Sequence, residues 1–123
     1  MRILCVDDDE NTCDLLRLML GFADFEVTAV QDTKAALKLI EGEQFSLYIL
    51  DGQLPGVSGL GLCEQIRQRD PKTPIIMFSG HAFDSDIEAG RQAGANAYIV
   101  KPDTRKIVPA VKRLLEEARA AIA

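Results

Sequence analysis

The segment Ile3-Leu4-Cys5-Val6-Asp7-Asp8-Asp9 places four apolar residues directly before three acidic ones. Two later segments have a similar form, with residues 47–50 leading into Asp51 and residues 98–100 leading into Lys101. A short apolar run without alternation is typical of a strand buried on both faces of a parallel sheet. The carboxyl ends of such strands meet at one edge, where ligands bind. The pattern therefore predicts that acids and a lysine gather at one sheet edge.

The whole chain alternates between strand and helix signals, which predicts five of each. Strands are expected at residues 3–6, 25–30, 45–50, 74–78 and 97–100. Caps at Asn11, Asp32 and Ser58 predict the first three helices, and two more are expected from about residues 84 and 108. The fourth has a small-residue face that should pack weakly. The last should begin late, since Pro109 lacks the backbone donor that a helix interior requires.

Length and composition indicate one domain, residues 1–123, large enough to bury roughly two-thirds of its unfolded surface. No apolar run approaches the roughly 20 residues of a membrane span, and no signal peptide is recognisable, so the expected location is the cytoplasm. The net charge of −5 argues against a nucleic-acid groove. The cysteines lie in apolar segments and are predicted to be reduced core thiols: Cys5, Cys13 and Cys63.

Four groups of residues, each after a predicted strand, occur together in one order. They are Val6-Asp7-Asp8-Asp9, Leu50-Asp51 with Leu54-Pro55-Gly56 and Gly59, Phe78-Ser79-Gly80, and Tyr98 with Lys101-Pro102. On these residues the chain resembles the response-regulator receiver domain of two-component signalling over essentially its full length. The resemblance implies an α/β fold of the flavodoxin-like, doubly wound type: a five-stranded parallel sheet in the order 2-1-3-4-5, with five helices in two layers.

The acidic residues have the chemistry of a phosphoryl acceptor with a metal ion. A carboxylate can attack a phosphoryl group and hold it as an acyl phosphate, and Asp51 is the predicted acceptor. Three carboxylates within about 5 Å of one another repel strongly enough to require a cation, and oxygen ligands favour Mg²⁺ (or Mn²⁺). The resemblance implies Asp8 as a direct ligand, Asp7 as a direct or water-bridged ligand, a side-chain oxygen of Asp51, and the backbone carbonyl of Gln53.

Three further residues have roles that the resemblance implies. Lys101 is expected to pair with Asp51 at rest and with a phosphoryl oxygen later. The Ser79 hydroxyl would donate to another phosphoryl oxygen. The peptide bond between Lys101 and Pro102 should be cis, although such bonds are a minority even before proline.

Together these residues predict a signalling switch and not an enzyme. The chain is expected to accept a phosphoryl group from a sensor histidine kinase or a histidine phosphotransfer protein onto Asp51, and later to hydrolyse it. The added charge should draw Ser79 and Lys101 inward and let Tyr98 rotate toward the core. The face of the fourth helix, fifth strand and fifth helix would then change for an output domain or partner protein, or for a second copy in a homodimer.

Two other functions are compatible with parts of the pattern. A small Mg²⁺-dependent phosphatase also uses an aspartyl phosphate, but it usually needs a second acid two residues after the nucleophile, where this chain has Gln53. A receiver-like adaptor would bind partners without phosphorylation, and the intact acceptor set argues against it. Taken singly, residues 7–9 could be a solvated turn, and Lys101 could extend from a strand end to solvent. Their joint occurrence favours the acceptor site.

Two positions depart from the family pattern. Gly52 follows the acceptor where a larger apolar residue is usual, and Ser58 stands where many relatives carry Asp. Neither is expected to touch the core chemistry. Gln53 and His81 occupy positions that tune the lifetime of the phosphoryl group in this family. The kinase, the output, the oligomeric state and the extent of the full protein stay open at this stage.

Overall fold

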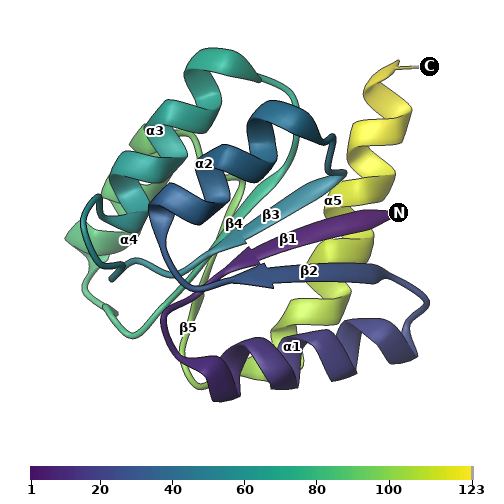
Figure 1. Cartoon of the computed structure of the whole chain (residues 1–123), viewed down its shortest axis with the longest axis horizontal. Helices are drawn as coiled ribbons and strands as arrows, with labels where there is room; N and C mark the ends of the chain where they lie inside the picture. Colours follow the sequence, from purple (N-terminus) through teal and green to yellow (C-terminus); the bar gives the residue numbers. More distant parts are fainter. Residues whose placement is uncertain (123) are drawn as a thin grey trace.

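The structure, a computed structural model that describes residues 1–122, is built on one parallel sheet (Figure 1). Its strands run in the order β2-β1-β3-β4-β5, which is the order that the resemblance implies. The strands are β1 (Arg2–Val6), β2 (Glu26–Val30), β3 (Leu47–Leu50), β4 (Ile75–Ser79) and β5 (Ala97–Val100). Every neighbouring pair is parallel, so the carboxyl ends of all the strands lie at one edge.

Five α-helices within residues 1–122 cover the two faces of this sheet (Figure 1). They are α1 (Glu10–Phe22), α2 (Thr33–Gly42), α3 (Gly59–Arg69), α4 (Asp84–Ala93) and α5 (Ile107–Ile122), with a 3-10 turn, η1 (Thr104–Lys106), before the last. Helices α1 and α5 pack on one face, and α2 and α3 pack on the other, with α4 beside α3. The predicted two-layer α/β fold is confirmed. In the described part of the chain, no helix is both long enough and apolar enough to span a bilayer.

The three central strands, β1, β3 and β4, are largely apolar because helices cover both faces of the sheet there. In β1, Ile3 and Cys5 pack in the cluster with α1 and α5, whereas Leu4 and Val6 pack in the cluster with α2 and α3. Every residue of β3 and β4 is buried as well. A strand with one face in water would alternate apolar and polar residues, so the unbroken run itself indicates burial on both faces.

The cysteines are free thiols buried in this core, as predicted. Cys5 lies on β1, Cys13 on α1 and Cys63 on α3. Burial raises the pKa of each thiol, that of Cys63 to about 11. The thiols therefore stay protonated at neutral pH and pack as small apolar groups.

The first helix has a different cap from the predicted one. Asn11 is predicted as the cap, but α1 starts before it and Asp9 is the N-cap residue. The Asp9 carboxylate accepts hydrogen bonds from the Asn11 amide at 3.1 Å and from the Thr12 hydroxyl at 2.8 Å. A carboxylate at this place both satisfies free amides and interacts favourably with the helix dipole. The caps predicted at Asp32 and Ser58 are confirmed, since each side chain accepts from a first-turn amide.

The last helix starts close to its predicted position. The turn η1 occupies part of the segment expected to be irregular, and α5 begins at Ile107, directly before the predicted Val108. Pro109 therefore lies in the first turn, where backbone amides have no partner within the helix. Its missing donor is no loss there, which is why a proline so near the start does not break the helix.

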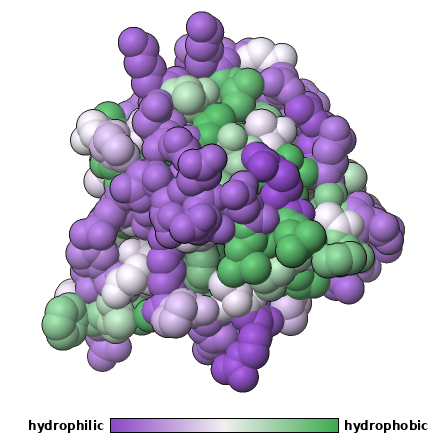
Figure 2. All heavy atoms as spheres, turned by 60° about the horizontal axis from the view of Figure 1, so that its bottom comes forward, coloured by the Kyte–Doolittle hydropathy of each residue, from purple (hydrophilic) through white to green (hydrophobic). Residues whose placement is uncertain are grey.

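Helix α1 carries apolar side chains on its outer side as well as on its inner side. Leu15, Leu18 and Phe22 are exposed, Phe22 to 82%. In Figure 2, where this side of the molecule is turned forward, hydrophobic patches interrupt a largely hydrophilic surface. The exposed side chains add nothing to the core, so α1 is held to the sheet by inner residues such as Leu16 and Leu20.

Arg67 joins α3 to the loops that precede β4 and β5, at the opposite edge of the sheet from the acidic cluster. Its guanidinium donates to the carbonyl oxygens of Gly94 at 2.9 Å, Thr73 at 2.7 Å and Asp70 at 3.0 Å. It also donates to Asn96 Oδ1 at 2.8 Å. One side chain thus satisfies acceptors before β4 and after α4, and it holds these segments against α3.

Arg67→Ala is expected to lower the free energy of unfolding by about 2 kcal/mol, because hydrogen bonds to charged groups contribute about 1.5–3 kcal/mol net. Urea denaturation followed by circular dichroism measures the loss. Arg69→Ala is the matched control, since this side chain is half exposed and pairs with Glu41 at 3.4 Å on the surface. The control should change stability by less than about 1 kcal/mol. Equal losses in both variants would contradict the role given to Arg67.

Candidate functional site

Three carboxylates meet at the carboxyl edge of the sheet. Asp7 follows β1 and Asp51 follows β3, and these strands are neighbours with Val6 opposite Leu50. The Asp51 amide donates to the Val6 carbonyl at 2.8 Å, which extends the pairing to the acid itself. One oxygen from each of Asp7, Asp8 and Asp51 lies within 4.8 Å of the others. The sheet therefore brings together the acids that the sequence predicts as a site.

The consecutive acids after β1 have different surroundings. Asp7 is buried, and its carboxylate accepts from the Asp9 amide at 2.9 Å. Asp9 turns toward α1 as its N-cap and is not part of the cluster. Asp8 is exposed and contributes an oxygen to the cluster. The acidic run thus contains two residues of the site and one helix cap.

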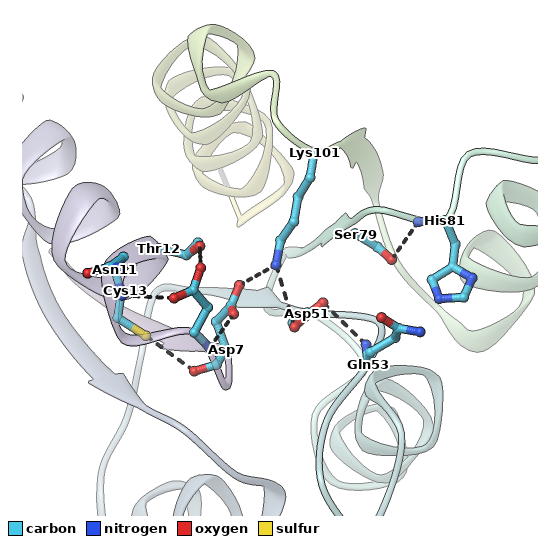
Figure 3. Close-up of polar contacts among 10 residues, drawn as sticks. Asp7, Asn11, Thr12, Cys13, Asp51, Gln53, Ser79, His81 and Lys101 are labelled. Carbon is cyan, nitrogen blue, oxygen red and sulfur yellow. Dashed lines mark hydrogen bonds and ion pairs between the residues drawn. The ribbon is translucent and has the colours of Figure 1, made fainter.

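Lys101 reaches the cluster from the end of β5 (Figure 3). Its Nζ lies 2.8 Å from Asp7 Oδ2 and 3.5 Å from Asp51 Oδ2. The sequence predicts Asp51 as the partner at rest, and the structure adds Asp7 as the nearer partner. An ammonium placed between two carboxylates offsets their mutual repulsion, which explains the sharing. The Lys101 amide donates to the Ser79 carbonyl at 2.8 Å, and the bond to Pro102 is cis, as the resemblance implies.

Lys101 alone does not balance the negative charge of the cluster. Burial raises the pKa of Asp51 to about 6; the charges of Asp7 and Asp8 raise it as well, while the Gln53 amide and Lys101 lower it. That amide donates to Asp51 Oδ1 at 3.2 Å. Burial acts to lower the pKa of Lys101, but its hydrogen bonds and charge interactions with Asp7 and Asp51 leave that pKa raised. One ammonium faces three carboxylates, an arrangement that attracts a further cation.

Ser79, His81 and Tyr98 are linked by hydrogen bonds beside the acids. Ser79 ends β4 and is fully buried, and its Oγ accepts from the His81 amide at 3.2 Å (Figure 3). The Tyr98 hydroxyl donates to the His81 carbonyl at 2.7 Å. The loop after β4 therefore connects the predicted hydroxyl donor with the predicted switch residue. The three residues line a cavity of about 240 Å³ together with Gly52, Gln53, Leu60, Met77 and Asp86.

Two glycines permit close contacts that the sequence does not reveal. A Cβ on Gly59 would lie 1.8 Å from the carbonyl oxygen of Asp51, so α3 could not start this close to the acid with any other residue. A Cβ on Gly90 would lie 2.9 Å from Tyr98 Cδ2. Gly90 is the only buried residue of α4, in agreement with the weak packing predicted for that helix. Gly59 belongs to a motif on which the resemblance rests. The motif alone does not show that this glycine approaches the carbonyl oxygen of Asp51.

The sequence predicts functions for Gln53 and His81 that geometry alone does not assign. Both side chains are exposed, and both residues line the cavity beside Ser79. Figure 3 shows them next to each other on the side of Asp51 opposite Asp7. Their role in the lifetime of a phosphoryl group, and the Gln53 carbonyl as a metal ligand, stay predictions.

Asp51→Asn is expected to stabilise the metal-free protein at neutral pH by about 1–2 kcal/mol. A shift of one pKa unit corresponds to about 1.4 kcal/mol, and screening by water at the partly open site reduces the effect. The pKa of Asp51 in the fold is about 6, above its ordinary value of 3.8, so its ionised form destabilises the fold. The gain should shrink as the pH falls from about 7 toward about 4, because the wild-type carboxylate then takes up a proton.

Urea denaturation across this pH range measures the gain. Asp14→Asn, an exposed acid on α1, is the control and should show no such pH-dependent gain. A variant Asp51→Asn that is less stable than wild type at neutral pH would contradict the crowding of charge at the site.

Comparison with known proteins points to one family. A model described as the response regulator receiver domain matches residues 3–112. The response regulator ArlR of Staphylococcus epidermidis is 37% identical over 114 residues, which cover 92% of this chain and 52% of ArlR. The chain spans about half the length of the curated relatives that it matches.

Solved structures support the same assignment. A CheY-like response regulator receiver domain protein from Methanospirillum hungatei has a TM-score of 0.92 at 34% identity, covering 98% of this chain and 97% of that chain. The response regulator TrrA of Thermotoga maritima, solved in complex with Mg²⁺-BeF, has a TM-score of 0.83 at 32% identity, covering 92% and 97%. The family match over most of the chain, together with these relatives, shows that the chain belongs to the response regulator receiver domains of two-component signalling.

Proposed function

We propose that this chain takes a phosphoryl group from a phosphohistidine of a sensor histidine kinase or a histidine phosphotransfer protein onto Asp51. The observation that carries this proposal is the buried Asp51 carboxylate, which lies within 4.8 Å of oxygens of Asp7 and Asp8 and 3.5 Å from Lys101 Nζ. Residues 1–123 act as a single receiver domain. The protein is a switch that processes its own phosphoryl group and no external substrate.

The transfer moves one phosphoryl group between two side chains. An Asp51 oxygen forms a bond to phosphorus while the bond from phosphorus to the donor's imidazole nitrogen breaks, and that nitrogen keeps the electron pair and takes up a proton. Lys101 offsets the charge on the phosphoryl oxygens, and the Ser79 hydroxyl donates to one of them. Later a water oxygen attacks phosphorus and the bond from phosphorus to the Asp51 oxygen breaks. That oxygen keeps the electron pair, which restores the carboxylate, and inorganic phosphate leaves with the oxygen and both protons of the water.

A divalent metal ion fits the oxygens at this edge. Asp7, Asp8 and Asp51 offer oxygens close enough to share one ion, and the Gln53 carbonyl is the proposed fourth protein ligand. Hard oxygen ligands of this kind favour Mg²⁺, with Mn²⁺ as a substitute. When bound, the ion offsets phosphoryl charge that a single lysine leaves uncompensated. The relative TrrA is in complex with Mg²⁺-BeF, which supports this assignment.

The output is a change in the surface formed by α4, β5 and α5. Phosphorylation adds about −1.5 to −2 of charge beside Lys101 and Ser79, and both side chains move toward it. Tyr98 then changes position. At rest its ring packs on Gly90 and its hydroxyl donates a hydrogen bond to the His81 carbonyl. An output domain, a partner protein or a second copy of the chain reads this change. Gln53 and His81, at the cavity beside the acceptor, set how long the phosphoryl group lasts.

Incubation with a small phosphodonor and Mg²⁺ is expected to add one phosphoryl group to the wild-type protein, read by intact mass. Asp51→Asn should remove the added mass, because the amide is not a nucleophile for phosphorus. Asp14→Asn is the control and should be labelled like wild type. A label that persists in Asp51→Asn would place the acceptor elsewhere.

Mg²⁺ is expected to raise the melting temperature of the wild-type protein, because a ligand that binds only the folded state stabilises it by mass action. A concentration of about 100 times the dissociation constant corresponds to about 2.7 kcal/mol. Asp8→Ala should abolish the response to Mg²⁺ while leaving the metal-free protein as stable as wild type or more so, since like-charge crowding is relieved. Asp14→Ala should respond as wild type does. An unchanged melting curve of wild type with Mg²⁺ would remove the metal site from the proposal.

A further inference from the structure

The loop that follows the acceptor, residues 52–58, joins β3 to α3 and carries Gln53, the proposed fourth metal ligand. The loop is closed at its base, where the Gly59 amide donates to the Gly52 carbonyl at 3.2 Å. The Gln53 amide donates to Asp51 Oδ1 at 3.2 Å, so the first residues of the loop are bonded to the acceptor itself. Most of the remaining loop residues are exposed. Packing alone therefore restrains this loop only weakly.

A threonine from another helix is bonded to the end of this loop. Thr33 is the first residue of α2, and its hydroxyl donates to the Val57 carbonyl at 2.8 Å. Thr33 is only 3% exposed. The other buried polar or charged residues within residues 1–122 are Asp7, Asp51 and Ser79, and all three belong to the proposed site. A buried hydroxyl is costly unless it is hydrogen-bonded, so the bond to Val57 fixes this side chain.

The carboxyl edge of the sheet brings Thr33 to the loop. Strand β2 ends at Val30, whose carbonyl accepts from the Asp7 amide at 3.1 Å, so α2 begins close to the acids. Helices α2 and α3 cover the same face of the sheet (Figure 1). The Val57 side chain rests against α3, since a Cβ on Gly61 would lie 2.6 Å from Val57 Cγ1. Val57 is thus held by α2 through its carbonyl and by α3 through its side chain.

We infer that Thr33 is a positioning residue for the metal site: its hydroxyl holds residues 52–58 in the conformation in which the Gln53 carbonyl binds a divalent ion next to Asp51. This inference rests on the proposed function, in which the acids and Gln53 share that ion. Thr33 is not itself a ligand and acts through the loop. A loop that leaves this conformation lowers the metal affinity in proportion to the fraction of molecules that keep it.

Thr33→Val removes the hydroxyl and keeps a β-branched side chain of similar size, so it isolates the hydrogen bond. The dissociation constant for Mg²⁺ is measured from amide shifts in a nuclear magnetic resonance titration. It should rise about threefold to tenfold in Thr33→Val, the factor in an equilibrium constant that one net hydrogen bond supplies. Thr33→Ser keeps the hydroxyl and should bind Mg²⁺ as wild type does.

Thr73→Val is the matched control. The Thr73 hydroxyl donates to the Asp70 carboxylate in the loop before β4, at the opposite edge of the sheet from the acids. This variant loses a side-chain hydrogen bond through the same substitution, so it should melt at a lower temperature than wild type. Its affinity for Mg²⁺ should equal that of wild type, because no restraint on residues 52–58 is lost.

Two further measurements separate positioning from simple stabilisation. In the metal-free protein, backbone order parameters of the loop amides should fall in Thr33→Val and stay at wild-type values in Thr33→Ser. With a small phosphodonor, Thr33→Val should be phosphorylated more slowly than wild type at limiting Mg²⁺ and at the wild-type rate at saturating Mg²⁺. A role confined to stability would not depend on the concentration of the ion.

The outcomes distinguish this inference from the function on which it rests. Thr33→Val with wild-type affinity for Mg²⁺ overturns the inference alone, and so does Thr33→Ser with an affinity as weak as that of Thr33→Val. If Thr33→Val does not fold, Thr33→Ala compared with Thr33→Ser gives the same test. If the affinity depends on the Thr33 hydroxyl but no phosphoryl group is taken up, the inference is supported and the proposed transfer fails. A wild-type protein that binds no Mg²⁺ overturns the proposed metal site and this inference with it.

Discussion

The repulsion among three carboxylates at the end of a buried sheet is the constraint on which the site depends. Parallel pairing of β1 with β3 brings Asp51 close to Asp7, and helices on both faces bury these strands. The burial that stabilises the strands also removes water from Asp51 and raises its pKa to about 6. One ammonium, shared between Asp7 and Asp51, offsets part of this cost. The remaining negative charge favours a cation at this edge.

Close backbone contacts complete the site around Asp51. Gly59 lets the start of α3 approach the Asp51 carbonyl, and Gly52 leaves room for the Ser79 hydroxyl. In a protein interior packed like a crystal, one methyl group would collide with the Asp51 backbone in the first place and with the Ser79 side chain in the second. The contacts of Arg67 with Gly94 and its other acceptors are different in kind, because they fix α3 to loops away from the acids.

The strands and the site were largely predictable, and the errors were local. Continuous apolar runs identify buried parallel strands because burial on both faces leaves no polar position. Asn11 was the wrong cap because Asp9 is also a good one, and the choice depends on which acids turn toward the sheet edge. The nearer partner of Lys101 was missed because it depends on how the ends of β1 and β5 face each other across the sheet.

The sequence by itself determined the two-layer α/β fold and the identity of the acids, lysine and serine at the strand ends. Periodicity and position after a strand are local properties, so they can be read without coordinates. Only the tertiary structure decided that Lys101 is shared by two carboxylates, that the Tyr98 hydroxyl bonds to the His81 carbonyl, and that the Ser79 hydroxyl lies over Gly52. These contacts join residues far apart in the chain, and their distances depend on how strands and helices pack, which no local pattern encodes.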